Sequence, residues 1–323
     1  MFRKIVALVA VLSTFALGGC FAEASSQHRL KELSAWVDTQ PALADLHVSR
    51  PREPSLFGDS YSHTLQAKGE VHANSVAEFF TALDQLYARF DELPRGKRRW
   101  LDVDVKADIQ GTEFTWTGRE WEPGKGERLV ELLEPFAAPE VGSVDMREDV
   151  EVFWVEVSRD FQVTDEAAHA YRDRAFRHLD SVKGTEMIQL SGFPLLHRTD
   201  PGGTRGFGAG SPSLRFSEFP QGYVGTATLA ETVDAATPYA VRAVTSYKGM
   251  YRWEFYADDD YDEEALKLIK QLLSHPDAGS PIEVKITSRT RVLGVALIGA
   301  KQEYPPKKPG PWQEDMDRVF YGS

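Results

Sequence analysis

Apolar and polar side chains follow a repeating order along the middle of this chain. Residues 101–105 alternate apolar with acidic side chains, which predicts a strand with one buried face. A turn is expected near Gly111, and Phe114 and Trp116 share one face of the strand after it. Leucines and a valine at helical spacing then predict a helix over 127–136, and two more strands are expected near 141–146 and 150–157.

The same order returns about 140 residues later, which is the spacing of an internal repeat. Residues 239–245 predict a strand and Gly249 a turn, after which Tyr251, Trp253 and Phe255 share one strand face. A helix is predicted over 262–273, and closing strands over 282–287 and 292–298.

The correspondence extends upstream of both segments. Leu30, Leu33 and Val37 mark a first helix, and Ala167, Ala170, Tyr171 and Phe176 mark its counterpart. Strands are expected near Leu46 and over 187–190. The weakest match pairs the long apolar helix over 76–90 with a short segment at 229–236.

Each half is therefore predicted to contain three consecutive units, each made of one helix followed by two strands. This order predicts an α+β fold with antiparallel sheets, helices on one face, and two pseudo-symmetric halves. The expected organisation is a signal peptide (1–19), a tether (20–27), the two halves (28–160 and 161–300) and a proline-rich C-terminal tail (301–323). The alternative is coincidence, because helix–strand–strand order is common.

The N-terminus has the pattern of a secretory signal. Arg3 and Lys4 precede an apolar run over residues 5–17, which is too short to cross a bilayer core of roughly 30 Å as a helix. The run ends in Leu17-Gly18-Gly19-Cys20, which resembles the lipobox of bacterial lipoproteins. The resemblance covers residues 1–20 only and implies that the Cys20 sulfur is lipidated and becomes the mature N-terminus.

This resemblance implies an extracytoplasmic protein held by its lipid on the cell membrane or the outer membrane. Phe21 stands where an aspartate would signal retention in the inner membrane of enterobacteria. The alternative is an ordinary secretory signal with a chance cysteine. Cys20 is the only cysteine, so no internal disulfide is expected.

The charge and composition of the chain restrict the classes of partner that it can bind. Removing residues 1–19 takes away Arg3 and Lys4, so the formal charge moves from −12 to −14. An acidic surface disfavours nucleic acid, which is bound mostly through neutralised phosphates. The expected partners are the membrane, through the lipid, and a protein of the cell envelope. With 42% hydrophobic and 27% charged residues, the mature chain is expected to be globular.

Two long polar loops, over 49–59 and 198–210, are the candidate binding surface. If the repeat is real they occupy equivalent places, and loops of this length are often functional or disordered. The candidate binding residues on them are Arg50, Arg52, Phe57, Arg205 and Phe207. The alternative is a pair of solvated loops. Trp312 and Phe320 indicate that the C-terminal tail docks, over a sheet edge or on another protein.

No catalytic, metal or cofactor site is predicted. The eight histidines lack metal-ligand spacing, and His169 and His178 are expected on opposite faces of a helix. The acidic run over 258–264 is interpreted as a helix cap. Asp102, Asp104 and Asp108 are interpreted as a solvated strand face, and Trp116 and Trp253 as core residues rather than a sugar-stacking platform.

Three functions remain open. The leading hypothesis is a non-enzymatic lipoprotein that binds a protein or small ligand through the loops or a sheet edge. The second is a hydrolase of envelope polymers, with distant carboxylates and histidines brought together in a cleft. The third is a structural spacer, which an exposed apolar patch of several hundred Å² would favour.

Overall fold

A computed structural model describes residues 27–50, 64–93, 100–122, 124–149, 152–182, 187–191, 213–216, 222–247, 249–257, 260–288, 291–299 and 310–322. The chain forms two compact units. The first comprises Met1–Ala137 with Met146–Glu151, and the second Ala138–Asp145 with Val152–Ser323. Within the described residues, no helix is both long and apolar enough to span a bilayer.

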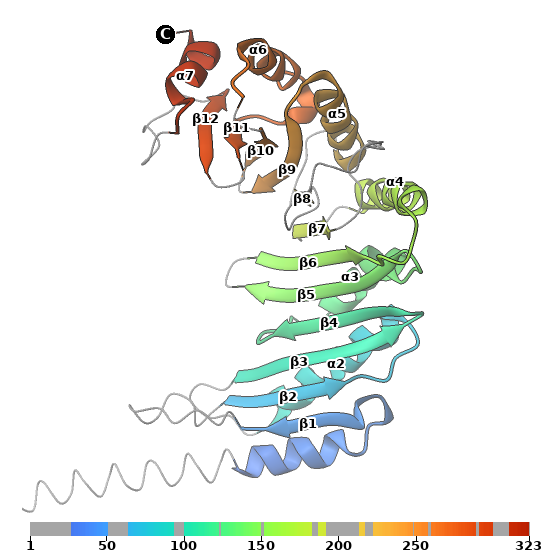
Figure 1. The fold of residues 1–323 in the computed structure, drawn as a ribbon. Helices are drawn as coiled ribbons and strands as arrows, with labels where there is room; N and C mark the ends of the chain where they lie inside the picture. The colour runs from blue at the N-terminus through green and yellow to red at the C-terminus, as the bar shows by residue number, and fades with distance from the viewer. Residues whose placement is uncertain are drawn as a thin grey trace, which may run out of the picture. The chain divides into compact units, whose positions relative to one another are not determined.

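The first unit starts with a helix over residues 27–37 and a hairpin of β1 (Asp45–Ser49) and β2 (Thr64–Glu70). A second hairpin follows α2, and α3 and the last part of β5 complete the unit (Figure 1). These elements are α2 (Val76–Glu92), β3 (Trp100–Ile109), β4 (Thr112–Gly118), α3 (Lys125–Leu133) and β5 (Val141–Asp149).

The second unit continues the same order of one helix and two strands. Its elements are β6 (Val152–Arg159), α4 (Asp165–Ser181), β7 (Met187–Ser191), β8 (Ser213–Phe216), α5 (Gly222–Ala236), β9 (Ala240–Tyr247), β10 (Met250–Tyr256), α6 (Glu263–Leu272), β11 (Ile282–Thr287), β12 (Val292–Ile298) and α7 (Gln313–Tyr321). The predicted α+β class is confirmed. The helix predicted over residues 229–236 is longer than expected, because α5 begins at Gly222.

The prediction of antiparallel sheets is wrong in part, because each unit has a mixed sheet. The hairpins β1/β2, β3/β4 and β9/β10 are antiparallel, whereas β2/β3, β6/β7 and β10/β11 are parallel. A helix lies between the strands of each parallel pair. It returns the chain to the end where the previous strand began, so the next strand runs the same way.

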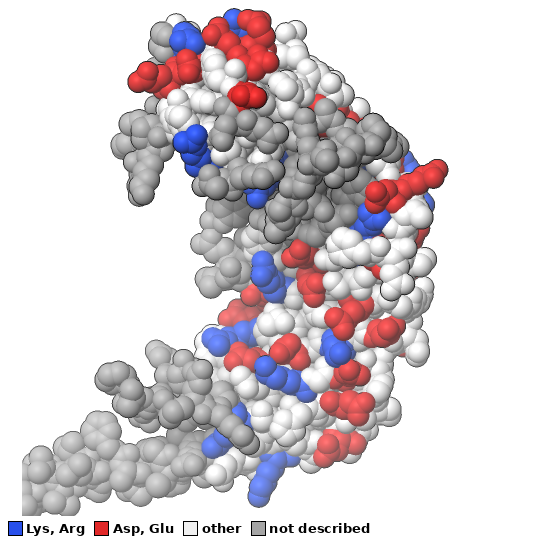
Figure 2. Space-filling model, in the orientation of Figure 1, with Lys and Arg blue, Asp and Glu red and all other residues white. Residues whose placement is uncertain are grey.

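One face of the first unit's sheet is the core. The apolar members of β3 and β4, among them Val103, Phe114 and Trp116, are buried. Phe114 contacts Phe79 and Trp116 donates to Tyr87, both on α2, which Figure 1 shows together with α3 on one side of the sheet. The opposite face carries charged pairs such as Lys68–Asp104 (3.0 Å) and Lys106–Glu70 (3.1 Å), and Figure 2 shows the two signs interleaved there. The solvated-face interpretation of Asp104 is therefore confirmed.

Local sequence explains where the helices begin. The Ser75 hydroxyl accepts a hydrogen bond from the Glu78 amide (3.2 Å), and the Glu78 carboxylate accepts one from the Asn74 amide (2.7 Å). At α6, the Asp262 carboxylate accepts from the Ala265 amide (3.0 Å). The capping interpretation of the acidic run is therefore confirmed at Asp262.

The C-terminal tail docks on the last strand of the second unit. Trp312, Met316 and Phe320 are buried, and α7 packs against β12 and α6. The Gln313 carboxamide accepts from the Val295 amide (3.1 Å) and donates to the Val295 carbonyl (2.8 Å). Of the two expected roles for the tail, the structure shows the covering of a sheet edge.

Candidate functional site

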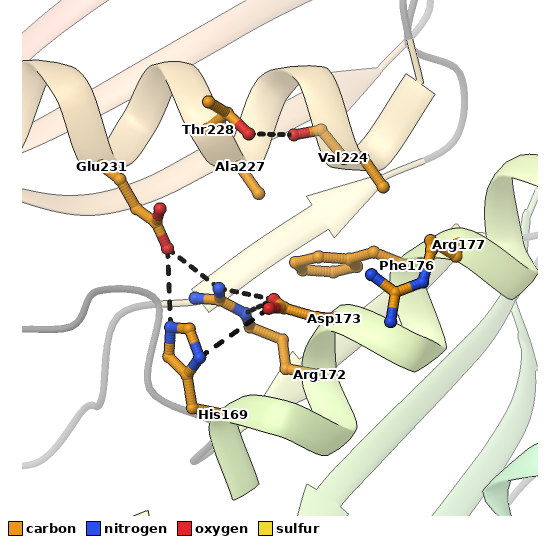
Figure 3. A pocket seen from close by; sticks show the side chains of 9 residues that line it. All are labelled: His169, Arg172, Asp173, Phe176, Arg177, Val224, Ala227, Thr228 and Glu231. Atoms are coloured by element: carbon orange, nitrogen blue, oxygen red, sulfur yellow. Dashed lines mark hydrogen bonds and ion pairs between the residues drawn. The ribbon is translucent and has the colours of Figure 1, made fainter. Parts of the chain in front are cut away.

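A pocket of about 140 Å³ lies in the second unit between α4 and α5 (Figure 3). Helix α4 contributes three cationic or titratable groups, one carboxylate and an aromatic ring, and α5 contributes the opposite wall. The lining residues are His169, Arg172, Asp173, Phe176, Arg177, Val224, Ala227, Thr228 and Glu231.

The two walls are joined at one end of the pocket. Asp180, in the last turn of α4, accepts hydrogen bonds from the Tyr223 and Val224 amides in the first turn of α5, the second at 3.1 Å. A carboxylate at this place satisfies amides that lack helical partners and interacts favourably with the helix dipole. The Phe176 and Tyr223 rings stack 6.1 Å apart. Contacts between α4 and α5 therefore fix the two walls of the pocket relative to each other.

Arg172 is the centre of the pocket's charge network. Its side chain is only 3% exposed, and one guanidinium nitrogen lies 2.9 Å from the Glu231 carboxylate and 2.7 Å from that of Asp173. Its charge also lies 5.7 Å from the centre of the Phe176 ring. A buried cation needs such partners, because an unpaired charge away from water is costly.

His169 lies between the same two carboxylates (Figure 3). Its Nε2 is 3.6 Å from Glu231 and its Nδ1 is 3.9 Å from Asp173. These distances are long for hydrogen bonds but short for electrostatic interaction. With a neutral imidazole, the cluster of His169, Arg172, Asp173 and Glu231 carries one net negative charge. Protonation of His169 would balance it.

Arg177 completes the lining at the solvent side. Its side chain is exposed, and no described residue is within hydrogen-bond or ion-pair distance of it. The Thr228 hydroxyl donates to the Val224 carbonyl (2.9 Å), so its oxygen keeps a lone pair for a ligand. Among the described residues, Arg177 is therefore a cation without a carboxylate partner, beside a wall of small apolar side chains.

The predicted site residues lie elsewhere or outside the described residues. Cys20, Arg52, Phe57, Arg205 and Phe207 are outside them, so the loop surface is not described. Arg50 is the last described residue after β1. Trp116 and Trp253 are fully buried, which agrees with the core interpretation.

The pocket itself was missed from the sequence. On α4, Tyr171 and Phe176 are buried as predicted, whereas Ala170 is exposed and Ala167 is half-buried. Ala168 and Arg172, which the prediction did not name, are also buried. The available signal was the charge: Arg172 falls four residues from both Ala168 and Phe176, on a helix face that is otherwise apolar.

None of the described residues that line the pocket is a cysteine or a lysine, and both of its carboxylates lie within 3 Å of Arg172. Among the residues that the structure describes, no three histidine, cysteine, aspartate or glutamate side chains are grouped so that they could hold a metal ion. Comparison with protein families, curated proteins and solved structures finds no match to this chain.

Proposed function

We propose that this chain is a lipid-anchored extracytoplasmic lipoprotein whose folded part binds a partner or ligand in the cell envelope. The observation that carries the proposal is the position of Cys20. The only cysteine in the chain ends a 13-residue apolar run, directly after Leu17, Gly18 and Gly19. Stable anchoring requires at least two acyl chains, which lipoprotein maturation adds at such a cysteine.

Metabolic labelling tests the anchor. Cells that express the chain with an alkyne analogue of palmitate are expected to label it, and the label should be lost in Cys20→Ala. The mature protein should remain with membranes after washing in high salt and be extracted by detergent. A Ser25→Ala variant is the matched control and should behave as the wild type. An unlabelled chain that is cleaved and freely soluble in the periplasm or medium would contradict the proposal.

The binding role is supported by the pocket between α4 and α5. Arg172 is paired with the carboxylates of Asp173 and Glu231, whereas Arg177 has no described partner and can bind a ligand. A screen by ligand-observed NMR with small carboxylates and amines tests this site. We expect carboxylates to bind and Arg177→Ala to weaken their binding about 10- to 100-fold, since a charge-assisted hydrogen bond contributes roughly 1.5–3 kcal/mol. Exposed Arg174, paired with Glu140, provides the control variant Arg174→Ala.

A hydrolase of envelope polymers is the second candidate. It is favoured by one observation, the position of His169 within 4 Å of two carboxylates in a pocket. In this role His169 would be a general base, oriented by Asp173 or Glu231. Incubation of the purified protein with cell-wall polymer and chromatography of released fragments tests it. Release that is lost in His169→Ala and retained in Arg177→Ala would favour the enzyme over the binding protein.

We also propose that the two halves descend from one duplicated unit. Matching features support this: positive-φ glycines at the hairpin turns (Gly111 and Gly249), buried indoles at Trp116 and Trp253, and a short 3-10 helix after both α3 and α6. An experimental structure tests it. Halves over residues 28–160 and 161–300 that fail to superpose over some 80 Cα atoms would contradict it.

A further inference from the structure

An indole of the first unit occupies a slot on the side of α2. The Trp121 ring stacks against Phe80 and Tyr87, with its centre 5.9 Å from each, at interplanar angles of 23° and 10°. Its N–H donates a hydrogen bond to the Asp84 carboxylate (2.5 Å). The slot therefore holds an aromatic ring by two stacking contacts and one hydrogen bond to a carboxylate.

Helix α4 is built in the same way as α2. Both helices have 17 residues, and both begin after a hydroxyl that accepts from the amide three residues later, Ser75 in α2 and Thr164 in α4. The two helices share seven buried positions, which lie 4, 5, 7, 8, 11, 12 and 15 residues after the cap. The likeness concerns two helices alone and does not depend on the proposed duplication of the halves.

The pocket between α4 and α5 is the counterpart of the Trp121 slot. The three α2 residues that contact Trp121 stand 5, 9 and 12 residues after the cap. On α4 these positions hold His169, Asp173 and Phe176, and all three line the pocket. Tyr223 stacks on Phe176 but does not line the pocket. Every lining residue belongs to α4 or α5, so no described loop residue fills this space as Trp121 does on α2.

The size of the pocket matches one aromatic ring. Its volume is about 140 Å³, close to the roughly 150 Å³ of an apolar protein cavity that holds benzene. Val224 and Ala227 supply an apolar wall on α5 (Figure 3). A single six-membered ring would be covered by His169 and Phe176 on one helix and by these small side chains on the other.

Asp173 keeps a carboxylate oxygen for a ligand. One of its oxygens accepts from Arg172 (2.7 Å), and the other lies 3.9 Å from the His169 Nδ1, beyond hydrogen-bond distance. The Asp173 side chain is 41% exposed, whereas Arg172 and His169 are buried. A donor on a bound ring can therefore reach this oxygen, as the Trp121 indole reaches Asp84.

Arg177 lies where it can hold the other end of the ligand. It follows Asp173 by four residues, so the two side chains leave the same face of α4 about 6 Å apart along the axis. They do not pair with each other, and in the view of Figure 3 the Phe176 ring lies between their charged groups. A benzene ring with a carboxylate and a hydroxyl at opposite positions has the length to reach both.

We propose that this pocket binds a small aromatic carboxylate whose ring carries an O–H or N–H donor opposite the carboxylate. The ring lies against His169 and Phe176, the donor bonds to Asp173, and the carboxylate binds Arg177. This ligand class rests on the binding role proposed above for the same pocket.

Three small carboxylates test the proposal with the mature protein in detergent micelles. 4-Hydroxybenzoate has both the ring and the donor, 4-methoxybenzoate keeps the ring and lacks the donor, and cyclohexanecarboxylate lacks the aromatic ring. Titration by ligand-observed NMR gives the three dissociation constants. We expect 4-hydroxybenzoate to bind about tenfold more tightly than either of the others, because each of them lacks one kind of contact that holds Trp121.

Substitution of Asp173 identifies the partner of the donor. Asp173→Asn keeps the size of the side chain but presents an amide that donates as well as accepts, so the preference for hydroxyl over methoxy should be lost. Asp165→Asn is the same change at an exposed position of the same helix and should leave the preference unaltered.

The possible outcomes separate the aromatic ligand from the binding role itself. Carboxylates that bind through Arg177 without preference for an aromatic ring would overturn the aromatic ligand and leave the carboxylate site standing. A hydroxyl preference that survives in Asp173→Asn would do the same. Failure of all three carboxylates to bind would overturn both.

Discussion

At the residue scale, the first unit contains a buried cation, Lys125, that interacts with one carboxylate and two indole rings. Lys125 is 7% exposed, and its ammonium lies 3.0 Å from Glu148 and within 6 Å of the Trp116 and Trp121 ring centres. The Trp121 indole donates to Asp84 (2.5 Å). The sequence identified Trp116 as core, because it alternates with polar residues on a strand. It did not identify Lys125, because two of its partners, Trp116 and Glu148, come from β4 and β5, which only the fold brings together.

Removal of the Lys125 charge is expected to destabilise the protein. Lys125→Met keeps the side-chain length but leaves Glu148 without its cation and ends both cation–π contacts. We expect a loss of about 1–3 kcal/mol in the free energy of unfolding by urea denaturation. The control is Lys68→Met, which removes an exposed pair with Asp104 and should cost less than about 0.5 kcal/mol. Equal losses for the two variants would contradict the role given to Lys125.

Alkaline stability provides a second residue-scale prediction. Burial raises the pKa of Tyr239 to about 12, and its hydroxyl accepts a hydrogen bond from the Asp262 amide (2.8 Å). The unfolded tyrosine ionises near pH 10. Its contribution to stability is therefore complete below pH 10 and is lost as pH rises from 10 to 12. Tyr239→Phe should lower stability at pH 8 by about 1 kcal/mol and lessen the further loss up to pH 12, measured by chemical denaturation at each pH.

At the element scale, most hairpins and helices followed from periodicity, whereas strand direction and edge cover did not. The spacing of apolar residues predicted β11 and β12 with their observed bounds. Periodicity carries no information on the direction of the neighbouring strand, which depends on the helix that joins them. The C-terminal tail was expected to dock, and the hydrogen bonds of Gln313 and Tyr321 to β12 show that α7 covers the edge of that strand.

Loss of the tail's contact with β12 should lower the stability of the second unit and make the protein prone to aggregation. Gln313→Ala removes both hydrogen bonds to Val295 and leaves a strand edge without its partner. We expect a loss of about 1–3 kcal/mol by thermal or urea unfolding and a rise in light scattering near the transition. Glu314→Ala, on the exposed side of α7, is the control. A variant as stable and as monomeric as the control would argue against an edge-covering role.

At the scale of the whole molecule, two compact units predict unfolding in more than one step. Hydrogen exchange measured by mass spectrometry can follow each unit separately. Lys125→Met is expected to speed exchange in peptides from β3, β4 and α3 in mild urea, while peptides from β9 to β12 change little. Equal acceleration in all peptides would show that the chain unfolds as a single cooperative unit.

The sequence by itself determined the α+β class, the helix–strand–strand order, the buried indoles and the cap at Asp262, because these depend on local spacing and side-chain chemistry. The N-terminal lipid and the duplicated halves stay predictions. Only the tertiary structure decided the parallel pairings, the charge cluster around Arg172, the burial of Lys125 and the covering of the β12 edge by α7. Each of these joins residues far apart in the chain, and no local pattern encodes which distant elements become neighbours.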